Sequence, residues 1–587
     1  MFSGLFGLLV LTTAFDQARG QAFASSPQDY TGKPSTDFSP EWQTYFQVTS
    51  SLPNVTFPLN RNWAGNIPVD RHEHPNNTLF FWGFEKENGS LTAAANERED
   101  EPWGVWLNGG PGSSSMLGLL FENGPLHIQN NYSMASNNFS WHQLADYIWV
   151  DQPVGTGWST CDQKGFVADE DQVGEDFPYI TKAYFGSPDP PVNLAKIVIG
   201  DGTIGSEVEF EVMPVVTVIE TYPQLVGYDT EVYEYFRAQS APVRKSSSSE
   251  RTKKQTLVKR ALEVDSHMAK RNLKARSLDA GAERIQKRDQ WKRDFVDQAN
   301  ETAVLDPYYG CDLYDELMDY ALNFSLPWKG HDFGNGFDVY NIPDALSPQI
   351  PMDASVFLNH NVTRAALHAP SKDWVDSIFY PFGNSDHGDP SPEPMTFLSE
   401  LAANASERNV GVLIYSGNDD SLVSHRSSEV VIQNTTFGGV QGYTRKPSTP
   451  WFDDNGELAG VVHQERNWTY VLVAGAGHLV PQQQPSRAYV ILREFILGNN
   501  RTGLVVNTTE TVSVVGGESS SLAVDVFPGQ SGIYMGSGTT QSTYTFPAAT
   551  VAAWQSFMAT ETATPRRHSR RRFIIYRIAD FSCSVGS

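Results

Sequence analysis

The chain has 587 residues, of which 40% are hydrophobic and 12% aromatic, so it has enough apolar surface for a large core, and a wholly disordered protein is excluded. Only three residues are cysteine, which excludes a small scaffold held together by many disulfides. The formal net charge is −25, and because an acidic chain repels nucleic acid and no apolar run reaches the roughly 20 residues of a membrane span, we predict neither a nucleic-acid partner nor an integral membrane segment.

Residues 1–20 are predicted to be a secretory signal peptide. They contain the apolar segment LFGLLVLTTAF, followed by small residues suited to cleavage near Gly20 or Ala24. A buried N-terminal helix is the alternative. Secretion is favoured by thirteen N-x-[ST] glycosylation sites, where chance would supply about four or five, so we expect a glycosylated protein that is secreted or vacuolar. The acceptor residues are Asn54, Asn76, Asn88, Asn131, Asn138, Asn300, Asn323, Asn361, Asn404, Asn434, Asn467, Asn500 and Asn507.

The N-terminal part of the core is expected at residues 38–205. Three runs of β-branched and aromatic residues there predict strands of a mostly parallel, covered sheet: GVWLNGG at 104–110, ADYIWVDQP at 145–153 and LAKIVIGDG at 194–202. Each run ends in loop-forming residues. Open α/β sheets bind their ligands at the carboxyl ends of strands, so we expect the chemistry at these ends.

The first of these strands runs into the glycine-rich loop WLNGGPGSSS, Trp106–Ser115, and then into the apolar helix MLGLLFENGP. Successive glycines allow a backbone N–H to approach a ligand oxygen closely, as an oxyanion hole requires. A purely structural turn is the alternative for this loop when it is considered alone.

Residues 206–345 are expected to form a cap inserted between two sheet strands. Glu207–Phe236 and Tyr308–Phe324 are predicted to be helical, and between them residues 244–293 hold 16 Lys and Arg against 6 Asp and Glu. This basic loop contains dibasic pairs that suit processing proteases, and a loop that stays intact is an equal alternative. The pairs are Lys259-Arg260, Lys270-Arg271, Lys287-Arg288 and Lys292-Arg293.

The C-terminal part of the core is expected at residues 346–503, with predicted strands GVLIYSGND at 411–419 and TYVLVAGAG at 469–477. Asp420 follows the first strand and His478 the second. Alone, an aspartate pair in a turn is usually a cap and a single histidine is usually structural. Together, an acid and then a histidine at successive strand ends match the second and third members of a Ser/Asp/His triad on an α/β-hydrolase sheet.

Residues 504–587 are rich in Ser, Thr and Gly and end in a basic tail. Their composition predicts an extension with little helical character. The three cysteines, Cys161, Cys311 and Cys583, are an odd number. At least one is therefore unpaired within the chain, and a bridge between Cys161 and Cys311 is left open.

Five segments together resemble the signature segments of the secreted fungal serine carboxypeptidases: WLNGGPGSSSMLGLLFENGP, DYIWVDQPVGTGWS, NLAKIVIGDGTIGS, YSGNDDSLV and GAGHLVPQQQP. The resemblance spans about residues 38–503, apart from the basic loop. It implies an α/β-hydrolase fold with an inserted helical cap and a serine-type carboxypeptidase that hydrolyses the C-terminal bonds of peptides and proteins at acidic pH. It implies no cofactor.

The resemblance also implies roles for individual residues. Asp420 matches the triad acid, His478 the general base, and Gly110 an oxyanion N–H donor. The residues that match the group recognising the substrate's terminal carboxylate are Trp106, Asn108, Gly109 and Glu122. A carboxyl group such as that of Glu122 hydrogen-bonds another carboxylate only while the two share a proton, which explains an acidic pH optimum.

The family's nucleophile, in the turn Gly-Glu-Ser-Tyr-Ala-Gly, has no counterpart in this chain. No G-x-S-x-G string occurs, and Gly517-Glu518-Ser519 lies downstream of His478, in the wrong order. QVGEDF, ending at Phe177, resembles the helix before the missing turn, and PYITKAYFG, beginning at Pro178, resembles the helix after it. We therefore predict that the central nucleophile strand is deleted here and that the chain as written is inactive.

Other motifs favour no metal or cofactor. GDGTIG at 200–205 fits the dinucleotide-binding pattern but lacks its acidic partner. Arg71-His72-Glu73-His74 is interpreted as a surface turn, and no zinc-peptidase motif is present. Two other functions stay open: a non-catalytic relative that binds peptide C-termini, and an acyltransferase that passes the acyl group to an alcohol. The oligomeric state is left undetermined.

Overall fold

The computed structural model describes residues 24–35, 40–69, 71–93, 97, 101–177, 193–206, 209, 213–240, 312–329, 337–345, 353–384, 389–500, 517–523, 526–535 and 542–563. The predicted signal peptide, the basic loop at 244–293, Cys311 and Cys583 lie outside these residues. The predictions made for them therefore stay predictions.

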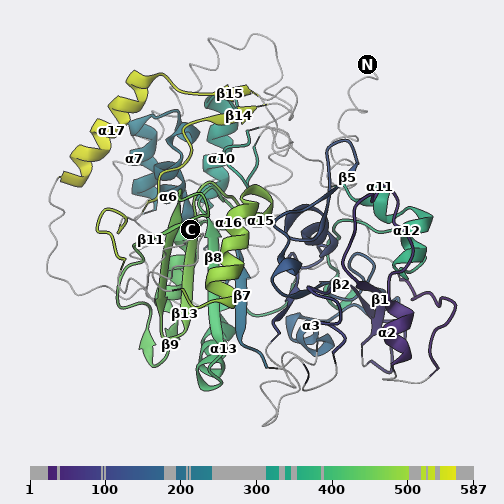
Figure 1. The fold of residues 1–587 in the computed structure, drawn as a ribbon. Coiled ribbons are helices and arrows are strands. Elements are labelled where there is room, and N and C mark those ends of the chain that lie inside the picture. Colours follow the sequence, from purple (N-terminus) through teal and green to yellow (C-terminus); the bar gives the residue numbers. More distant parts are fainter. Residues whose placement is uncertain are drawn as a thin grey trace, which may run out of the picture.

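The N-terminal part of the core contains a four-stranded sheet in the order β1-β2-β6-β3, of which Figure 1 labels β1 and β2. Its strands are β1 (Asn62–Pro68), β2 (Thr78–Phe84), β3 (Trp103–Trp106) and β6 (Asp146–Asp151). The pairing of β3 with β6 is parallel, whereas β2 pairs antiparallel with both β1 and β6. Two of the predicted strands are confirmed as β3 and β6.

The C-terminal part of the core contains a five-stranded sheet in the order β11-β12-β13-β8-β7. Its strands are β7 (Lys196–Gly200), β8 (Gly411–Gly417), β11 (Thr449–Phe452), β12 (Leu458–Glu465) and β13 (Trp468–Val473). The strands β7, β8 and β13 pair in parallel, and every residue of β8 and β13 is buried. The other three predicted strands are thereby confirmed.

The expectation of a mostly parallel sheet is wrong for the outer strands. β12 and β13 are joined by a two-residue turn, Arg466-Asn467, in which both residues have positive φ. Such a turn matches the twist of a hairpin and can only connect antiparallel strands. The result is a mixed arrangement, in which the parallel strands lie toward the β3 end of one sheet and the β7 end of the other, and the antiparallel strands lie at the opposite ends.

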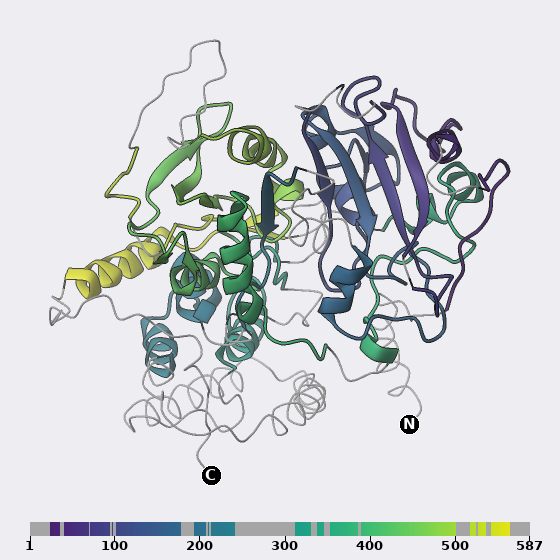
Figure 2. The same cartoon turned by 90° about the horizontal axis from the view of Figure 1, so that it is seen from below.

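The two sheets end at β3 and β7. Among the described residues, no strand pairs with the outer edge of β3 or of β7, although Figure 2 shows the two sheets side by side. A strand in the middle of a covered sheet is normally buried, yet Trp103 of β3 is 45% exposed and no residue of β7 is fully buried. The helix that precedes the predicted deletion is present as α3 (Glu170–Asp176), whereas residues 178–192 lie outside the described part.

The cap helices pack around a core of their own. They are α6 (Met213–Thr221), η3 (Pro223–Val226), α7 (Thr230–Gln239) and α10 (Leu313–Phe324). Asp229 caps α7 and Asp312 caps α10, each accepting backbone N–H groups of the first turn. The predicted helical character of both cap segments is confirmed for the described residues.

The C-terminal extension contains more structure than its composition predicts. It forms β14 (Ile533–Met535), β15 (Ser542–Tyr544) and the helix α17 (Ala548–Ala563). The prediction of little helical character is therefore wrong. The helix is stabilised from outside, because Trp554 and Phe557 pack against Tyr233 of the cap, and Figure 1 shows α17 beside α7.

Short helices, turns and hairpins complete the described structure. These elements are α2 (Glu41–Phe46), η1 (Gly118–Glu122), β4 (Leu126–Ile128), β5 (Met134–Ser136), η2 (Trp141–Gln143), α11 (Ser355–Leu358), α12 (Asn361–Ala366), η4 (Phe382–Asn384), α13 (Met395–Glu407), α14 (His425–Asn434), β9 (Thr436–Phe437), β10 (Val440–Gln441), α15 (Val480–Gln483), α16 (Pro485–Val490) and η5 (Ile491–Leu497). Within the described residues, no helix has the length and apolar character needed to span a membrane. Cys161 is buried and is described as a free cysteine. The bridge to Cys311 stays an open possibility, because Cys311 lies outside the described residues.

Candidate active site

Asp420 and His478 meet at the carboxyl ends of two neighbouring strands. β8 and β13 are adjacent and parallel, so the loops that follow them leave the sheet at the same edge. Asp420 lies three residues after β8, and His478 lies five residues after β13. Their side chains are hydrogen-bonded, with Nδ1 of His478 2.9 Å from Oδ2 of Asp420. The structure therefore brings together the predicted acid and the predicted base.

The two aspartates of the turn face in different directions. Asp420 is 1% exposed, and its Oδ1 accepts the backbone N–H groups of Leu422 and Val423 at 2.8 and 3.1 Å. Asp419 instead accepts a hydrogen bond from Nε2 of Gln530 at 2.9 Å. Only Asp420 is thus oriented by its own turn toward the imidazole.

His478 is held from both sides. Its backbone N–H donates to the carbonyl oxygen of Tyr340 at 2.7 Å, and the two rings lie 5.0 Å apart. Burial lowers the pKa of His478, but the charge and hydrogen bond of Asp420 outweigh burial and raise this pKa to about 9. The charges of Asp201 and Glu122 act in the same direction. At acidic and neutral pH the imidazole is therefore held in its charged form.

Replacement of Asp420 by asparagine is expected to lower the pKa of His478 from about 9 to below about 8, because the charge of the hydrogen-bonded carboxylate is lost. An NMR titration of histidine-labelled protein measures this pKa directly. The matched control is Asp419→Asn, which removes the neighbouring carboxylate that faces Gln530 and should leave the pKa of His478 nearly unchanged. An equal fall in both variants would contradict the assignment of Asp420 as the partner.

The residues predicted to recognise a terminal carboxylate form a hydrogen-bonded chain. Nε1 of Trp106 donates to Oδ1 of Asn108 at 2.7 Å, and Nδ2 of Asn108 donates to Oε1 of Glu122 at 3.3 Å. Glu122 is 4% exposed, and its burial raises its pKa to about 7. At acidic pH this carboxyl group is protonated and can donate a hydrogen bond to an anionic oxygen.

Glu122 faces His478 across the two sheets. The charge of His478 acts on the pKa of Glu122, and the charge of Glu122 acts on that of His478. The helix η1, which ends at Glu122, packs against α15, which begins two residues after His478. Glu122 and the Asp420–His478 pair are therefore close enough for their charges to interact.

Gly109 and Gly110 are exposed in the loop after β3. Gly110 has φ +127°, and a Cβ atom there would lie 2.8 Å from the backbone nitrogen of Gly112. Only glycine fits this position without strain. The roles of these two glycines toward a ligand stay predictions.

A comparison with known protein families identifies the family of this chain. The model of the serine carboxypeptidase family matches residues 53–189 and 179–498. The chain belongs to the serine carboxypeptidase family. The two matched stretches overlap next to Pro178, where the sequence predicts the deletion.

Curated relatives and a solved structure resemble this serine carboxypeptidase. A carboxypeptidase Y homolog of Arthroderma benhamiae is 29% identical, over 80% of this chain and 88% of that protein. The serine-type carboxypeptidase F of Aspergillus niger is 28% identical, over 77% and 86%. The crystal structure of the prohormone-processing carboxypeptidase Kex1 of Saccharomyces cerevisiae aligns over 79% of this chain and 99% of that one, with a TM-score of 0.50 and 19% identity. The fold is the predicted α/β-hydrolase fold.

The structure adds two residues of this carboxypeptidase that sequence reasoning did not single out. Asp201 follows β7, is 2% exposed and accepts the backbone N–H of Gly417 at 2.7 Å. Burial, followed by the charge of Asp420, holds the pKa of Asp201 well above its usual range. The strand-end rule points to Asp201, since it lies in the predicted loop after 194–202. Tyr340 carries no comparable signal, because it lies in the cap segment, far from His478 in sequence.

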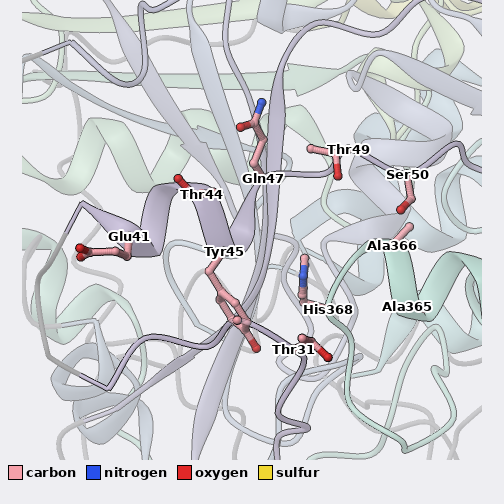
Figure 3. A pocket seen from close by; sticks show the side chains of 11 residues that line it. Thr31, Glu41, Thr44, Tyr45, Gln47, Thr49, Ser50, Ala365, Ala366 and His368 are labelled. Carbon is pink, nitrogen blue, oxygen red and sulfur yellow. The ribbon is translucent and has the colours of Figure 1, made fainter.

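A separate cavity of about 460 Å³ lies beside α2 and α12 (Figure 3). Its lining includes Tyr45 and His368, and most of the other lining residues are polar. None of the predicted site residues borders it. The predicted site at the strand ends is therefore separate from this cavity. The segment Arg71–His74 forms a turn, in which Arg71 pairs with Asp176 at 2.7 Å.

Proposed function

We propose that this protein binds the C-terminal residues of peptides and proteins at acidic pH, and that the complete product of its gene hydrolyses their last peptide bond. The observation that carries the proposal is the hydrogen bond of 2.9 Å between His478 and Asp420, facing the buried Glu122. A base and a carboxylate-binding acid at one site match the needs of an enzyme that cuts next to a free C-terminus.

His478 is suited to act as the general base. Asp420 accepts from Nδ1 of His478, so this bond fixes the tautomer, and once the imidazole is neutral its Nε2 can take the proton of a nucleophile. The same Nε2 then gives that proton to the leaving amine. The N–H of Gly110 is proposed to stabilise the negative charge that develops on the carbonyl oxygen.

Glu122 is suited to select a substrate with a free C-terminus. With a pKa of about 7, its carboxyl group is protonated at acidic pH and donates to the substrate carboxylate. As the pH rises through that value, the proton is lost and two carboxylates repel each other. Trp106, Asn108 and Gly109 are proposed to complete this recognition group.

Glu122→Gln is expected to abolish the pH dependence of peptide binding. The wild-type chain should bind a blocked dipeptide about tenfold more weakly at pH 8 than at pH 5, because Glu122 loses its proton in this range. Glutamine donates at every pH, so the variant should change its affinity by less than about threefold. Calorimetry measures both affinities, and the same dipeptide with a C-terminal amide is the control. A variant that keeps the full pH dependence would remove Glu122 from the carboxylate site.

We propose that the gene encodes one more parallel strand, which carries the nucleophilic serine and lies between β3 and β7. The support is topological: both strands lie at sheet edges among the described residues, and α3, which should lead into the missing strand, ends at the predicted junction. The end of a strand between them would fall next to the Asp201 and His478 loops. Sequencing the transcript across Asp176–Ile180 tests this, and an uninterrupted cDNA that encodes this chain would contradict it.

A non-catalytic peptide-binding protein is the second candidate. It is favoured by one observation: the chain from Trp106 to Glu122 is intact although the nucleophile is missing. A fluorophosphonate probe applied to protein purified from its native source separates the two candidates. Labelling means that a serine nucleophile exists, and the absence of labelling favours the binding protein.

We also propose that the protein is glycosylated and is secreted or vacuolar. Eleven of the thirteen acceptor asparagines lie in the described part of the chain, and none of these is buried. An enzyme that depends on a protonated Glu122 is suited to an acidic compartment.

A further inference from the structure

The C-terminal extension returns to the active site. It follows residue 498, where the match to the family model ends, so the family match does not account for it. Phe527 is buried in the core that contains residues of β8 and β13, whereas Ile533 is buried in the core of the cap. The segment Phe527–Tyr534, which we call the strap, therefore connects the C-terminal sheet with the cap.

Gln530 lies in the middle of the strap, and all of its polar groups are hydrogen-bonded. Its backbone N–H donates to the hydroxyl of Tyr222, and its carbonyl accepts from Nε2 of Gln224, both at 3.1 Å. Its side chain accepts from the hydroxyl of Tyr534 at 2.7 Å and donates to Oδ2 of Asp419 at 2.9 Å. The backbone of Gln530 is thus fixed by the cap, and its side chain holds the turn that contains the Asp420 carboxylate.

Tyr534 connects the strap to the segment Asp338–Ala345, which we call the Tyr340 segment. The N–H of Tyr534 donates to the carbonyl of Pro343 at 2.6 Å, and the N–H of Ala345 donates to the carbonyl of Tyr534 at 2.9 Å. The same segment contacts the catalytic loops, since the N–H of Ile342 donates to the carbonyl of Asp419 at 3.1 Å.

The strap also fits closely against the cap. A Cβ atom at Gly529 would lie 2.5 Å from the ring of Tyr222, so only glycine allows the strap to pass there. Nearby, Nδ2 of Asn418 donates to the carbonyl of Pro528 at 3.3 Å. The strap therefore contacts the Asp419 turn, the cap and the Tyr340 segment within a few residues.

We propose that the strap is a structural part of the active site and that Gln530 is a positioning residue. It fixes the position of the Asp419–Asp420 turn relative to the Tyr340 segment. In this position both the Asp420 carboxylate and the carbonyl of Tyr340 can hydrogen-bond to His478. The proposal rests on the proposed function only in treating His478 as the base. Asp419 is fully buried, and its carboxyl group is hydrogen-bonded by the side chains of Tyr222, Gln530 and Asn418. Loss of the Gln530 donor weakens this set of hydrogen bonds at a buried group, and relief of that cost requires the turn to move.

Hydrogen exchange of the full chain tests the strap without any need for catalysis. In Gln530→Met, the amides of His478 and Ile342, which donate to the carbonyls of Tyr340 and Asp419, should exchange at least tenfold faster at pH 5. The amides of β1 and β2 should be unchanged. The matched control is Ser531→Ala, at an exposed neighbour in the strap, which should behave like the wild type. Equal exchange in Gln530→Met and the control would overturn the proposal.

Binding of a blocked dipeptide at pH 5 separates the strap from the proposed function. Gln530→Met should bind about tenfold more weakly than Ser531→Ala. If the wild type binds no dipeptide while exchange at His478 still accelerates, the strap stands and the proposed function fails. If Gln530→Met also accelerates exchange in β1 and β2, the second variant Tyr534→Phe, which removes one hydroxyl, decides the question by the same measurement. Faster exchange at His478 but not in β1 and β2 supports the proposal for the strap, and unchanged exchange at His478 overturns it.

Discussion

Insertion of the corresponding strand and Gly-Glu-Ser-Tyr-Ala-Gly turn of a matched relative between Phe177 and Pro178 is expected to convert an unreactive chain into one that a fluorophosphonate labels nearly one-to-one. The inserted serine would lie at the end of a strand between β3 and β7, where the His478 and Asp201 loops also end. We expect hydrolysis of a blocked dipeptide at acidic pH to rise from background to a rate typical of enzymes, roughly 1–1000 per second.

The same insertion should stabilise the fold. β3 and β7 each present a row of N–H and C=O groups that no described strand pairs, and each such group costs about 1–3 kcal/mol when it is buried without a partner. A parallel strand between them would satisfy both rows. The melting temperature of the inserted variant should therefore exceed that of the chain as written, which calorimetry measures.

The matched control replaces the inserted serine by alanine. This variant should be as stable as the serine variant but should neither react with the probe nor hydrolyse the dipeptide. Stabilisation without labelling in the serine variant would support the missing strand but contradict the triad. Lower stability in both variants would contradict the position of the strand.

The free energy of unfolding is expected to fall by at least about 5 kcal/mol between pH 5 and pH 7.5, with a fall in melting temperature of roughly 5–10 °C. The cause is a set of buried carboxyl groups in the acidic chain. Burial raises the pKa of Glu122, Glu209 and Asp338 to about 7, and that of Asp419 to about 6.

The direction of this effect follows from the proton count. Between about pH 4.5 and pH 7, these carboxyl groups hold protons in the folded chain but not in the unfolded one, so a rise in pH favours unfolding. His478, whose pKa is raised to about 9, acts in the same direction above pH 6.5. His127 and His142 oppose it, because burial lowers the pKa of each to about 4. Stability should therefore be greatest between about pH 4 and pH 5.

Chemical denaturation at a series of pH values measures this dependence. Glu209 is outside the proposed site, and its side-chain Oε1 accepts a hydrogen bond from the backbone N–H of Ser206 at 3.0 Å. Glu209→Gln copies the protonated form and should reduce the slope by about one proton, or about 1.4 kcal/mol per pH unit. A stability that is constant or rises from pH 5 to pH 7.5 would contradict the contribution of the buried carboxyl groups.

The central strands were predictable because nearly all of their residues are apolar. IVIG in β7, VLIY in β8 and YVLV in β13 are continuous apolar runs that end in glycine or aspartate, as strands buried on both faces require. The outer strands β1 and β12 were not predicted. Both contain glycine, and their antiparallel pairing depends on hairpins formed by residues outside the strands.

The Asp420–His478 pair was predictable since strand order alone brings the ends of β8 and β13 together. Tyr340 and the strap were not predictable in this way, because their positions depend on side-chain packing between segments far apart in sequence. The helix α17 shows the same limit. Its sequence AATVAAWQSFMATETA has no apolar stripe, and its contact with the cap through Trp554 arises only in the folded chain.

The position of the strap in the chain has a consequence for biosynthesis. Every other residue proposed for the site, from Trp106 to His478, precedes the strap, so these residues leave the ribosome first. Domains generally begin to fold during synthesis, starting from the N-terminus. Here the Asp419–Asp420 turn and the Tyr340 segment can form their contacts with the strap only after the strap itself has been synthesised. We therefore expect that a ribosome-bound chain translated only to about residue 500 does not bind peptides. Binding should begin once translation has passed Tyr534.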